Sequence, residues 1–171
     1  MSNLFAVSVV GRDRPGIVAD VSGRLLDLGV NVEDAVTSLL SGHFALMLVC
    51  SAPRWATADD LRLSLRALPG DLHTAVWEVS ERPERSQPSH VVTVYGPDRS
   101  GIVHQVASAL AGRGVNICDM TCRLGGGVYA LTLEVEVPAA LEPERLEADL
   151  REAVVSLGLE VTLAAIDAAV L

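Results

Sequence analysis

The chain has 171 residues, of which 50% are hydrophobic and 20% are charged, a balance typical of a folded globular protein. A net charge of −9 and only 4% aromatic residues argue against a nucleic-acid-binding surface, which needs a basic face or stacking side chains. We see no signal peptide, no apolar run of about 18 residues that would span a membrane and no disulfide framework among the three cysteines, so we expect a cytoplasmic protein with free thiols.

The first half of the chain reads as β-α-β-β-α-β from its hydrophobic periodicity and its glycine and proline breaks. The expected elements are a strand at 4–10, a helix at 14–28, strands at 32–40 and 43–51, a helix ending near 68 and a strand at 73–79. Near-continuous apolar character places the third strand in the centre of the sheet, buried on most sides. Thr57 and Asp60 predict a capping box at the second helix, and Gly29 ends the first helix.

The segment between the first strand and the first helix has the sequence GRDRPGIV, residues 11–18. Gly11 is expected to break the strand, because glycine accepts a positive φ. Asp13 is the expected N-cap of the helix, and Pro15 would then lie in its first turn. A helix N-terminus beside Gly16, with its amides accessible, suits a small carboxylate. The alternative is that Asp13 and Gly16 only cap and turn the chain.

The second half of the chain repeats the first after a polar segment with two prolines, SERPERSQPSH, which reads as a linker. The expected elements are strands at 91–95, 116–124, 128–137 and 159–167 and helices at 101–113 and 143–157. GPDRSGIV, residues 96–103, lies 85 positions after GRDRPGIV. Between 7–53 and 92–138 no gap is needed, and 20 of 47 positions are identical. The chain therefore consists of two copies of one unit.

A β-α-β-β-α-β unit with right-handed crossovers predicts an α+β, ferredoxin-like fold. Each unit would be an antiparallel four-stranded sheet in the order 4-1-3-2, with both helices on one face. We expect domains at 1–80 and 91–171, joined by a linker at 81–90 and paired side by side. The second strand of each unit is then an edge strand, which favours pairing with a second unit or a homodimer.

These motifs resemble ACT domains, the small regulatory modules that bind amino acids. The resemblance is carried by the two GxDxxG-I-V loops, the first helix of each copy running on into Gly-Val-Asn, and the element order. It covers nearly the whole chain, although Ser100 stands where the family pattern usually has proline. The tandem layout is similar to the glycine cleavage system transcriptional repressor group of double-ACT proteins. The resemblance implies that an effector binds where two copies meet.

Side-by-side pairing about a pseudo-twofold axis would bring the loop of one copy to the start of the second strand in the other. The first predicted ligand site consists of Asp13, Arg14, Gly16 and Ile17 with Asn116 and Ile117. The second predicted ligand site consists of Asp98, Arg99, Gly101 and Ile102 with Asn31 and Val32. Helix amides would bind the ligand carboxylate, and the asparagines offer both a donor and an acceptor to a zwitterion. The arginines are carboxylate clamps or ordinary surface residues, and the asparagines contact ligand or only shape a turn.

Other side chains carry weaker signals for a site. Cys118 and Cys122 lack zinc-site spacing and are expected in the core. The four histidines do not cluster as metal ligands, although His104 has a position from which it can line a pocket. No catalytic motif or cofactor fingerprint is visible, so we expect neither an enzyme nor a cofactor.

The sequence thus favours a non-catalytic regulatory protein that binds a small amino acid and acts on a transcription regulator through protein contact. A regulatory subunit acting in trans on an amino-acid biosynthetic enzyme is the main alternative. A fragment of an enzyme that has lost its catalytic domain is a weaker one.

Overall fold

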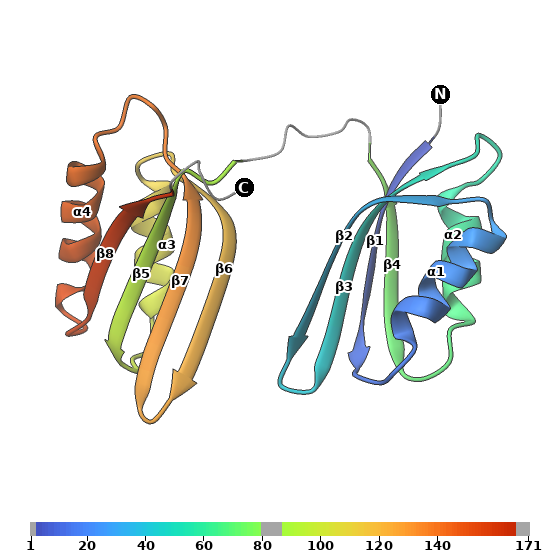
Figure 1. Cartoon of the computed structure of the whole chain (residues 1–171), viewed down its shortest axis with the longest axis horizontal. Helices are drawn as coiled ribbons and strands as arrows, with labels where there is room; N and C mark the ends of the chain where they lie inside the picture. The colour runs from blue at the N-terminus through green and yellow to red at the C-terminus, as the bar shows by residue number, and fades with distance from the viewer. Residues whose placement is uncertain (1–2, 80–86, 167–171) are drawn as a thin grey trace. The chain divides into compact units, whose positions relative to one another are not determined.

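The computed structural model describes residues 3–79 and 87–166, and the chain divides into two compact units between residues 83 and 84. Unit 1 contains β1 (Asn3–Arg12), α1 (Ile17–Asp27), β2 (Asn31–Leu40), β3 (His43–Ala52), α2 (Ala58–Arg66) and β4 (Leu72–Glu78), as Figure 1 shows. Unit 2 contains β5 (His90–Pro97), α3 (Ile102–Ala111), β6 (Asn116–Gly125), β7 (Val128–Glu136), α4 (Pro143–Val155) and β8 (Glu160–Ala165). The predicted βαββαβ order is confirmed in both units. Within these two ranges, no helix has the length and apolar character needed to cross a membrane.

Each unit has one antiparallel sheet, in the order β2-β3-β1-β4 and β6-β7-β5-β8. This is the predicted ferredoxin-like order, with β2 and β6 at an edge. β3 is central as predicted, but only one of its faces is buried. Leu46 and Leu48 point to the core, whereas Met47 between them is 45% exposed, because the helices cover one face of the sheet and leave the other open.

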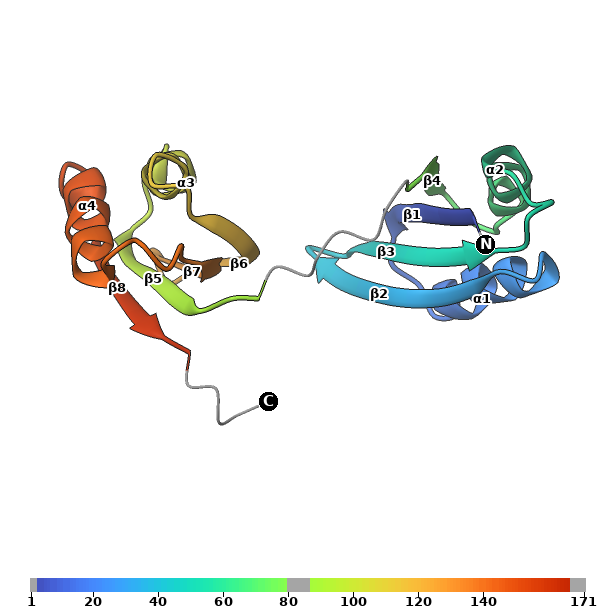
Figure 2. The same cartoon turned by 90° about the horizontal axis from the view of Figure 1, so that it is seen from above.

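The two cores lie between each sheet and its pair of helices, which share one face of the sheet (Figure 2). Helical periodicity explains the packing, since α1 and α3 bury residues spaced by four. In α1 these are Ile17, Val21 and Leu25, and in α3 they are Ile102, Val106 and Leu110. The same repeat positions therefore supply the core of both units.

The second helix of unit 1 begins as its sequence predicts. The backbone N–H of Thr57 donates to Asp60 Oδ2 at 2.8 Å, and the Asp60 N–H donates back to Thr57 Oγ1 at 3.3 Å, which completes the capping box. The Thr57 hydroxyl also donates to Asp60 Oδ2 at 2.7 Å, and this bond, followed by the one from the Thr57 N–H, lowers the pKa of the Asp60 carboxyl. Gly29 follows the end of α1 with φ 67°, the left-handed conformation expected of a residue that ends a helix.

The start of α1 differs from its prediction in three ways. β1 continues through Gly11 to Arg12, so Gly11 does not break the strand. Glycine is required there because a Cβ would lie 2.4 Å from the backbone oxygen of Asp71. The helix begins at Ile17, so Pro15 precedes it, and its N-cap is Gly16 with φ 88° rather than Asp13.

Most of the predicted linker, residues 80–86, lies outside the described residues. Ser89, close to its predicted end, is held by unit 2, since its N–H donates to the Val135 carbonyl at 2.8 Å. Its hydroxyl also accepts from the Val137 N–H at 3.0 Å. The domain limits 1–80 and 91–171 remain predictions, as does side-by-side pairing.

Candidate functional site

The β1–α1 and β5–α3 loops bring a glycine to the start of a helix in both units. Gly16 and Gly101 are the N-cap residues, with φ 88° and 94°, and neither helix has a side-chain cap. Left-handed backbone of this kind favours glycine, since a Cβ would be strained there. The first amides of α1 and α3 are therefore left to bind water or an anion.

In unit 1, Arg14 is bound within its own unit. Its Nη2 donates to Asp20 Oδ2 at 2.7 Å and to the Pro69 carbonyl at 2.8 Å, and its Nη1 donates to the Pro15 carbonyl at 3.1 Å. These contacts tie the β1–α1 loop to the first turn of α1 and to the segment after α2. Nη1 also lies 3.7 Å from where a Cβ on Gly16 would be. Arg14 therefore acts as a structural clamp on this loop.

Unit 2 lacks this clamp, although its loop has the same shape. Arg99 takes the place of Arg14, but Gln105 takes the place of Asp20. Within residues 3–79 and 87–166, Arg99 has no hydrogen bond or ion pair, and the buried Oε1 of Gln105 has no hydrogen-bond partner. No atom of the described chain would lie within 4 Å of a Cβ on Gly101, apart from its neighbours in sequence. The space beside Gly101 is thus open, whereas the guanidinium of Arg14 lies beside Gly16.

Tyr129 of β7 lies near the second loop and was not predicted as a site residue. Burial, a hydrogen bond with Cys122 and the charges of Cys122 and Asp98 together raise the pKa of Tyr129 to about 12. The phenol is therefore protonated at neutral pH. Phe44 is the equivalent residue in unit 1. The difference between Phe44 and Tyr129 is visible in the sequence, but only the structure places Tyr129 of β7 beside the loop.

The predicted asparagines lie far from the loop of their own unit. Asn31 pairs with Ser51 at one end of the sheet, whereas Arg12, which leads into the β1–α1 loop, pairs with His43 at the other. Eight residues of β3 separate these ends, about 27 Å at 3.4 Å per residue. Asn116 pairs with Glu136 at the equivalent position of unit 2. Neither unit by itself brings loop and asparagine together.

The remaining predicted residues divide by exposure. Ile17 and Ile102 are each 2% exposed, so their side chains belong to the cores and only their backbone amides face the loop. Val32 is 37% exposed on the edge strand, and Ile117 packs in part against the core of unit 2. Asp13 is exposed, and its N–H donates to the Gly42 carbonyl at 3.0 Å.

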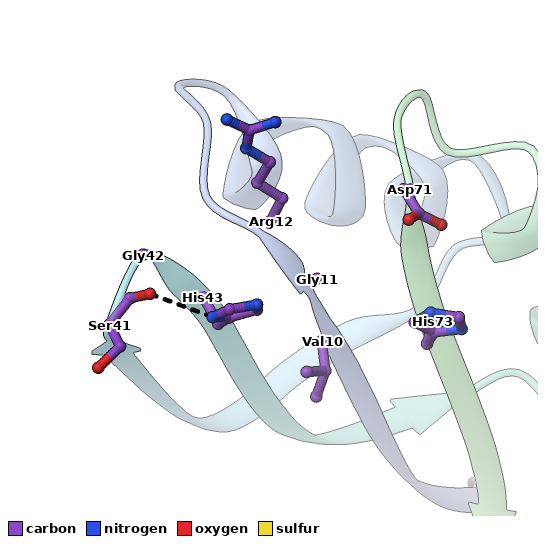
Figure 3. Close-up of a pocket in the computed structure, with 8 residues that line it drawn as sticks. All are labelled: Val10, Gly11, Arg12, Ser41, Gly42, His43, Asp71 and His73. Atoms are coloured by element: carbon purple, nitrogen blue, oxygen red, sulfur yellow. Dashed lines mark hydrogen bonds between the residues drawn. The ribbon is translucent and has the colours of Figure 1, made fainter.

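A cavity of about 560 Å³ lies at the end of β1 in unit 1, beside the first loop. It is lined by Val10, Gly11, Arg12, Ser41, Gly42, His43, Asp71 and His73. Figure 3 shows the two histidines on either side of β1, with Val10 between them. The ring Nδ1 of His43 is 3.2 Å from the Ser41 carbonyl, which makes this nitrogen the donor.

The sequence does not reveal this cavity, because its two histidines are 30 positions apart and line it together only through the pairing of β3 and β4 with β1. Unit 2 has Pro97 and Val128 in place of Arg12 and His43, so this lining is not repeated. Among the residues that the structure describes, no group of three potential ligands can hold a metal ion.

A family model for the ACT domain matches residues 3–76 and again residues 90–164. The chain belongs to the ACT domain family. The two matches agree with the two copies of the repeat, so the protein is a tandem ACT-domain protein with one ACT domain in each unit.

Similar proteins include two named relatives and a solved structure. A UPF0237 protein of Streptococcus pneumoniae is 44% identical over 46 residues, which cover 27% of this chain and 52% of the relative. The chain thus spans about half the length of that relative. The glycine cleavage system transcriptional repressor of Escherichia coli is 25% identical over 121 residues, 70% of this chain and 64% of the repressor. A protein of unknown function from Galdieria sulphuraria has a crystal structure with a TM-score of 0.81 and 25% identity, covering 98% of this chain and all of that one.

The cysteines of this tandem ACT protein are all free thiols, but one of them is placed differently from its prediction. Cys50 is buried, whereas Cys122 is exposed and Cys118 is half-buried. Both of the latter lie on β6, and an edge strand is less covered by helices than a central one. The expectation that Cys122 belongs to the core is therefore wrong. His104 is exposed on α3.

Proposed function

We propose that this tandem ACT-domain protein is a cytoplasmic, non-enzymatic regulator that binds a small amino acid at its helix N-termini and passes the signal to a partner protein. The observation that carries the proposal is the pair of uncapped helix starts behind Gly16 and Gly101. Backbone amides there suit a carboxylate, and the partial positive charge of a helix N-terminus adds to the attraction.

The proposed sites use both units. Because each loop and its asparagine lie at opposite ends of their own sheet, a site that combines them needs edge strands β2 and β6 to approach in antiparallel fashion. Site A would then comprise the loop Asp13–Ile17 with Asn116 and Ile117. Site B would comprise the loop Asp98–Ile102 with Asn31 and Val32. The asparagine would bind the ammonium group, which the helix amides cannot accept.

The two sites differ in their arginine. Arg14 is occupied by Asp20 and Pro69, so in site A it would shape the loop instead of binding ligand. Arg99 is available in site B to bind the carboxylate bidentately. The open space at Gly101 also leaves room for a ligand in site B. We therefore propose site B as the tighter of the two.

Titration calorimetry with glycine, serine and the branched amino acids tests this proposal. We expect Asn31→Ala and Arg99→Met to weaken site B and Asn116→Ala to weaken site A. Arg14→Met serves as the matched control for Arg99→Met, with a smaller direct effect on affinity. If both asparagine variants bind as tightly as wild type, the sites do not span two units. If no amino acid binds the wild type, the proposal fails.

The partner is proposed as a transcription regulator, by analogy with the name of the Escherichia coli relative. This chain would then affect DNA only through its partner, because a chain with a net charge of −9 repels a phosphate backbone. Affinity capture with and without the bound amino acid tests this part. Recovery of a transcription regulator supports it, whereas recovery of the catalytic subunit of a biosynthetic enzyme favours regulation of that enzyme in trans.

A further inference from the structure

The open face of the unit 1 sheet carries exposed apolar side chains. Val10, Val36, Met47 and Trp77 point away from the helices and are 44%, 63%, 45% and 42% exposed. We define the apolar face as three neighbouring rows across the sheet, which contain these four residues together with Ser8, Ala75, Ser38, Ala45, His73, Asp34, Val49 and Ala6. Two shallow hollows of about 190 and 250 Å³ lie on it, both lined by Val36 and Met47. The largest apolar patch on the surface of a monomer is often a site of contact with a partner.

Unit 2 provides an internal control. The middle row of the unit 1 face is Val36, Met47, Ser8 and Ala75, one residue from each strand. The same row in unit 2 is Thr121, Thr132, Thr93 and Thr162. Two sheets of one fold thus carry Val36 and Met47 in one copy and two threonines at the equivalent positions of the other. The fold itself therefore does not require the exposed apolar side chains of unit 1.

We propose that the apolar face binds the apolar face of a second copy of this chain, around a twofold axis that runs along the middle row. Most oligomers of one chain have such symmetry. Sheets that pack face to face lie about 10 Å apart, with strand directions within about 30° of each other. Val36 and Met47 lie on the axis, so each packs close to its own counterpart.

The neighbouring rows are complementary under this axis. One row contains Ser38, Ala45, Val10 and His73, and the row on the other side of the middle contains Asp34, Val49, Ala6 and Trp77. The twofold axis lays each of these two rows against the opposite row of the second copy. Ser38 then meets Asp34, a hydroxyl beside a carboxylate, and His73 meets the ring of Trp77. At the two positions between them alanine meets valine, so that a small side chain faces a larger one.

The distribution of charged side chains favours the apolar face of a second copy over the equivalent face of unit 2 as the surface that covers it. A net charge of −9 opposes contact between two copies, but among the residues of the apolar face Asp34 is the only carboxylate, so little of that charge lies on it. The equivalent face of unit 2 carries Asp119 and Glu134 beside its threonines. Packing the apolar face onto it would bury these polar groups without partners.

The expected dimer is reversible. Four strands about 4.8 Å apart and five residues of about 3.4 Å each give a face of about 19 by 17 Å. This is smaller than the roughly 800 Å² per partner of a standard interface. We therefore expect the wild type to pass from monomer to dimer as its concentration rises from about 5 to 500 μM in sedimentation velocity.

The test replaces Val36 and Met47 by the residues that unit 2 carries at the same positions, as V36T/M47T. We expect the dissociation constant of the dimer to rise at least about tenfold. A second variant, Ala45→Arg, blocks the face with a long side chain that points to solvent in the monomer. The matched control is L26S/L63S, which removes two leucines from the helix surfaces, 74% and 71% exposed. It should dimerise as the wild type does.

Fluorescence gives a second readout, because Trp77 becomes covered in the dimer. Its emission should shift to shorter wavelength with concentration in the wild type and in L26S/L63S, but not in V36T/M47T or Ala45→Arg. Far-ultraviolet circular dichroism confirms that each variant is folded. A wild type that stays monomeric at the highest concentration overturns the proposal. So does V36T/M47T if it dimerises like the wild type, or L26S/L63S if it loses the dimer equally.

Discussion

Replacing Arg14 by methionine should destabilise unit 1, whereas the same change at Arg99 should leave unit 2 nearly unaffected. The bond from Arg14 to the Pro69 carbonyl has a charged donor and contributes about 1.5 kcal/mol. The ion pair with Asp20 is about one-third exposed and adds about 0.5 kcal/mol. We therefore expect R14M to lower the free energy of unfolding of unit 1 by about 2 kcal/mol.

Tryptophan fluorescence measures this unit selectively. Both tryptophans of the chain, Trp55 and Trp77, lie in unit 1, and both tyrosines lie in unit 2. In a urea titration with a slope of about 1 kcal/mol/M, R14M should lower the tryptophan-monitored midpoint by about 2 M. R99M should change the stability of unit 2, followed by tyrosine emission, by less than about 0.5 kcal/mol.

A double-mutant cycle with Asp20→Asn isolates the ion pair. Its coupling energy should be about 0.5 kcal/mol, with most of the R14M effect surviving in the Asp20→Asn background. The reasoning is refuted if R14M leaves the tryptophan midpoint unchanged. It is refuted equally if R99M is as destabilising as R14M, because Arg99 has none of the contacts of Arg14 within the described ranges.

Three further predictions concern unit 1 and use the same fluorescence assay. Thr57→Ala removes the capping box and should cost about 1 kcal/mol. Because Thr57 lowers the pKa of Asp60, the stability from that carboxylate is present above its ordinary pKa and lost as pH falls through the lower folded value. Thr57→Ala should flatten this acid dependence, and an unchanged acid limb would contradict the assignment. Burial, and to a lesser extent Glu33, raises the pKa of Cys50 from 9.0 to about 11, so unit 1 should lose stability as pH rises from 9 to about 11. Cys50→Val should abolish that alkaline loss, and a slope that survives it must come from another group. Gly11→Ala places a Cβ against the Asp71 carbonyl and should lower the free energy of unfolding by about 1–3 kcal/mol, whereas a neutral effect would show that β4 can move away.

Local sequence patterns predicted the structure correctly where the deciding interaction joins residues that are close together in the sequence. Thr57 and Asp60 are three residues apart, so their capping box depends only on one helical turn. Gly29 likewise ends α1 through its own backbone conformation. Asp13 failed as an N-cap for the opposite reason. α1 begins after Gly16, while the Asp13 N–H donates to the Gly42 carbonyl, 29 residues away, a contact that a sequence window does not contain.

The sequence by itself determined that the chain has two copies of a βαββαβ unit, which strands are central and which helix positions are buried. These properties follow from hydrophobic periodicity and from the internal repeat, both of which can be seen in the order of the residues. Only the tertiary structure decided that Arg14 is held by the Pro69 carbonyl while Arg99 is not. It alone placed His43 and His73 on either side of β1 in the lining of one cavity, and set Val36 beside Met47 in one exposed row. The physical reason is that strand register joins residues distant in sequence, and the pattern within one strand does not specify what the neighbouring strand places beside it.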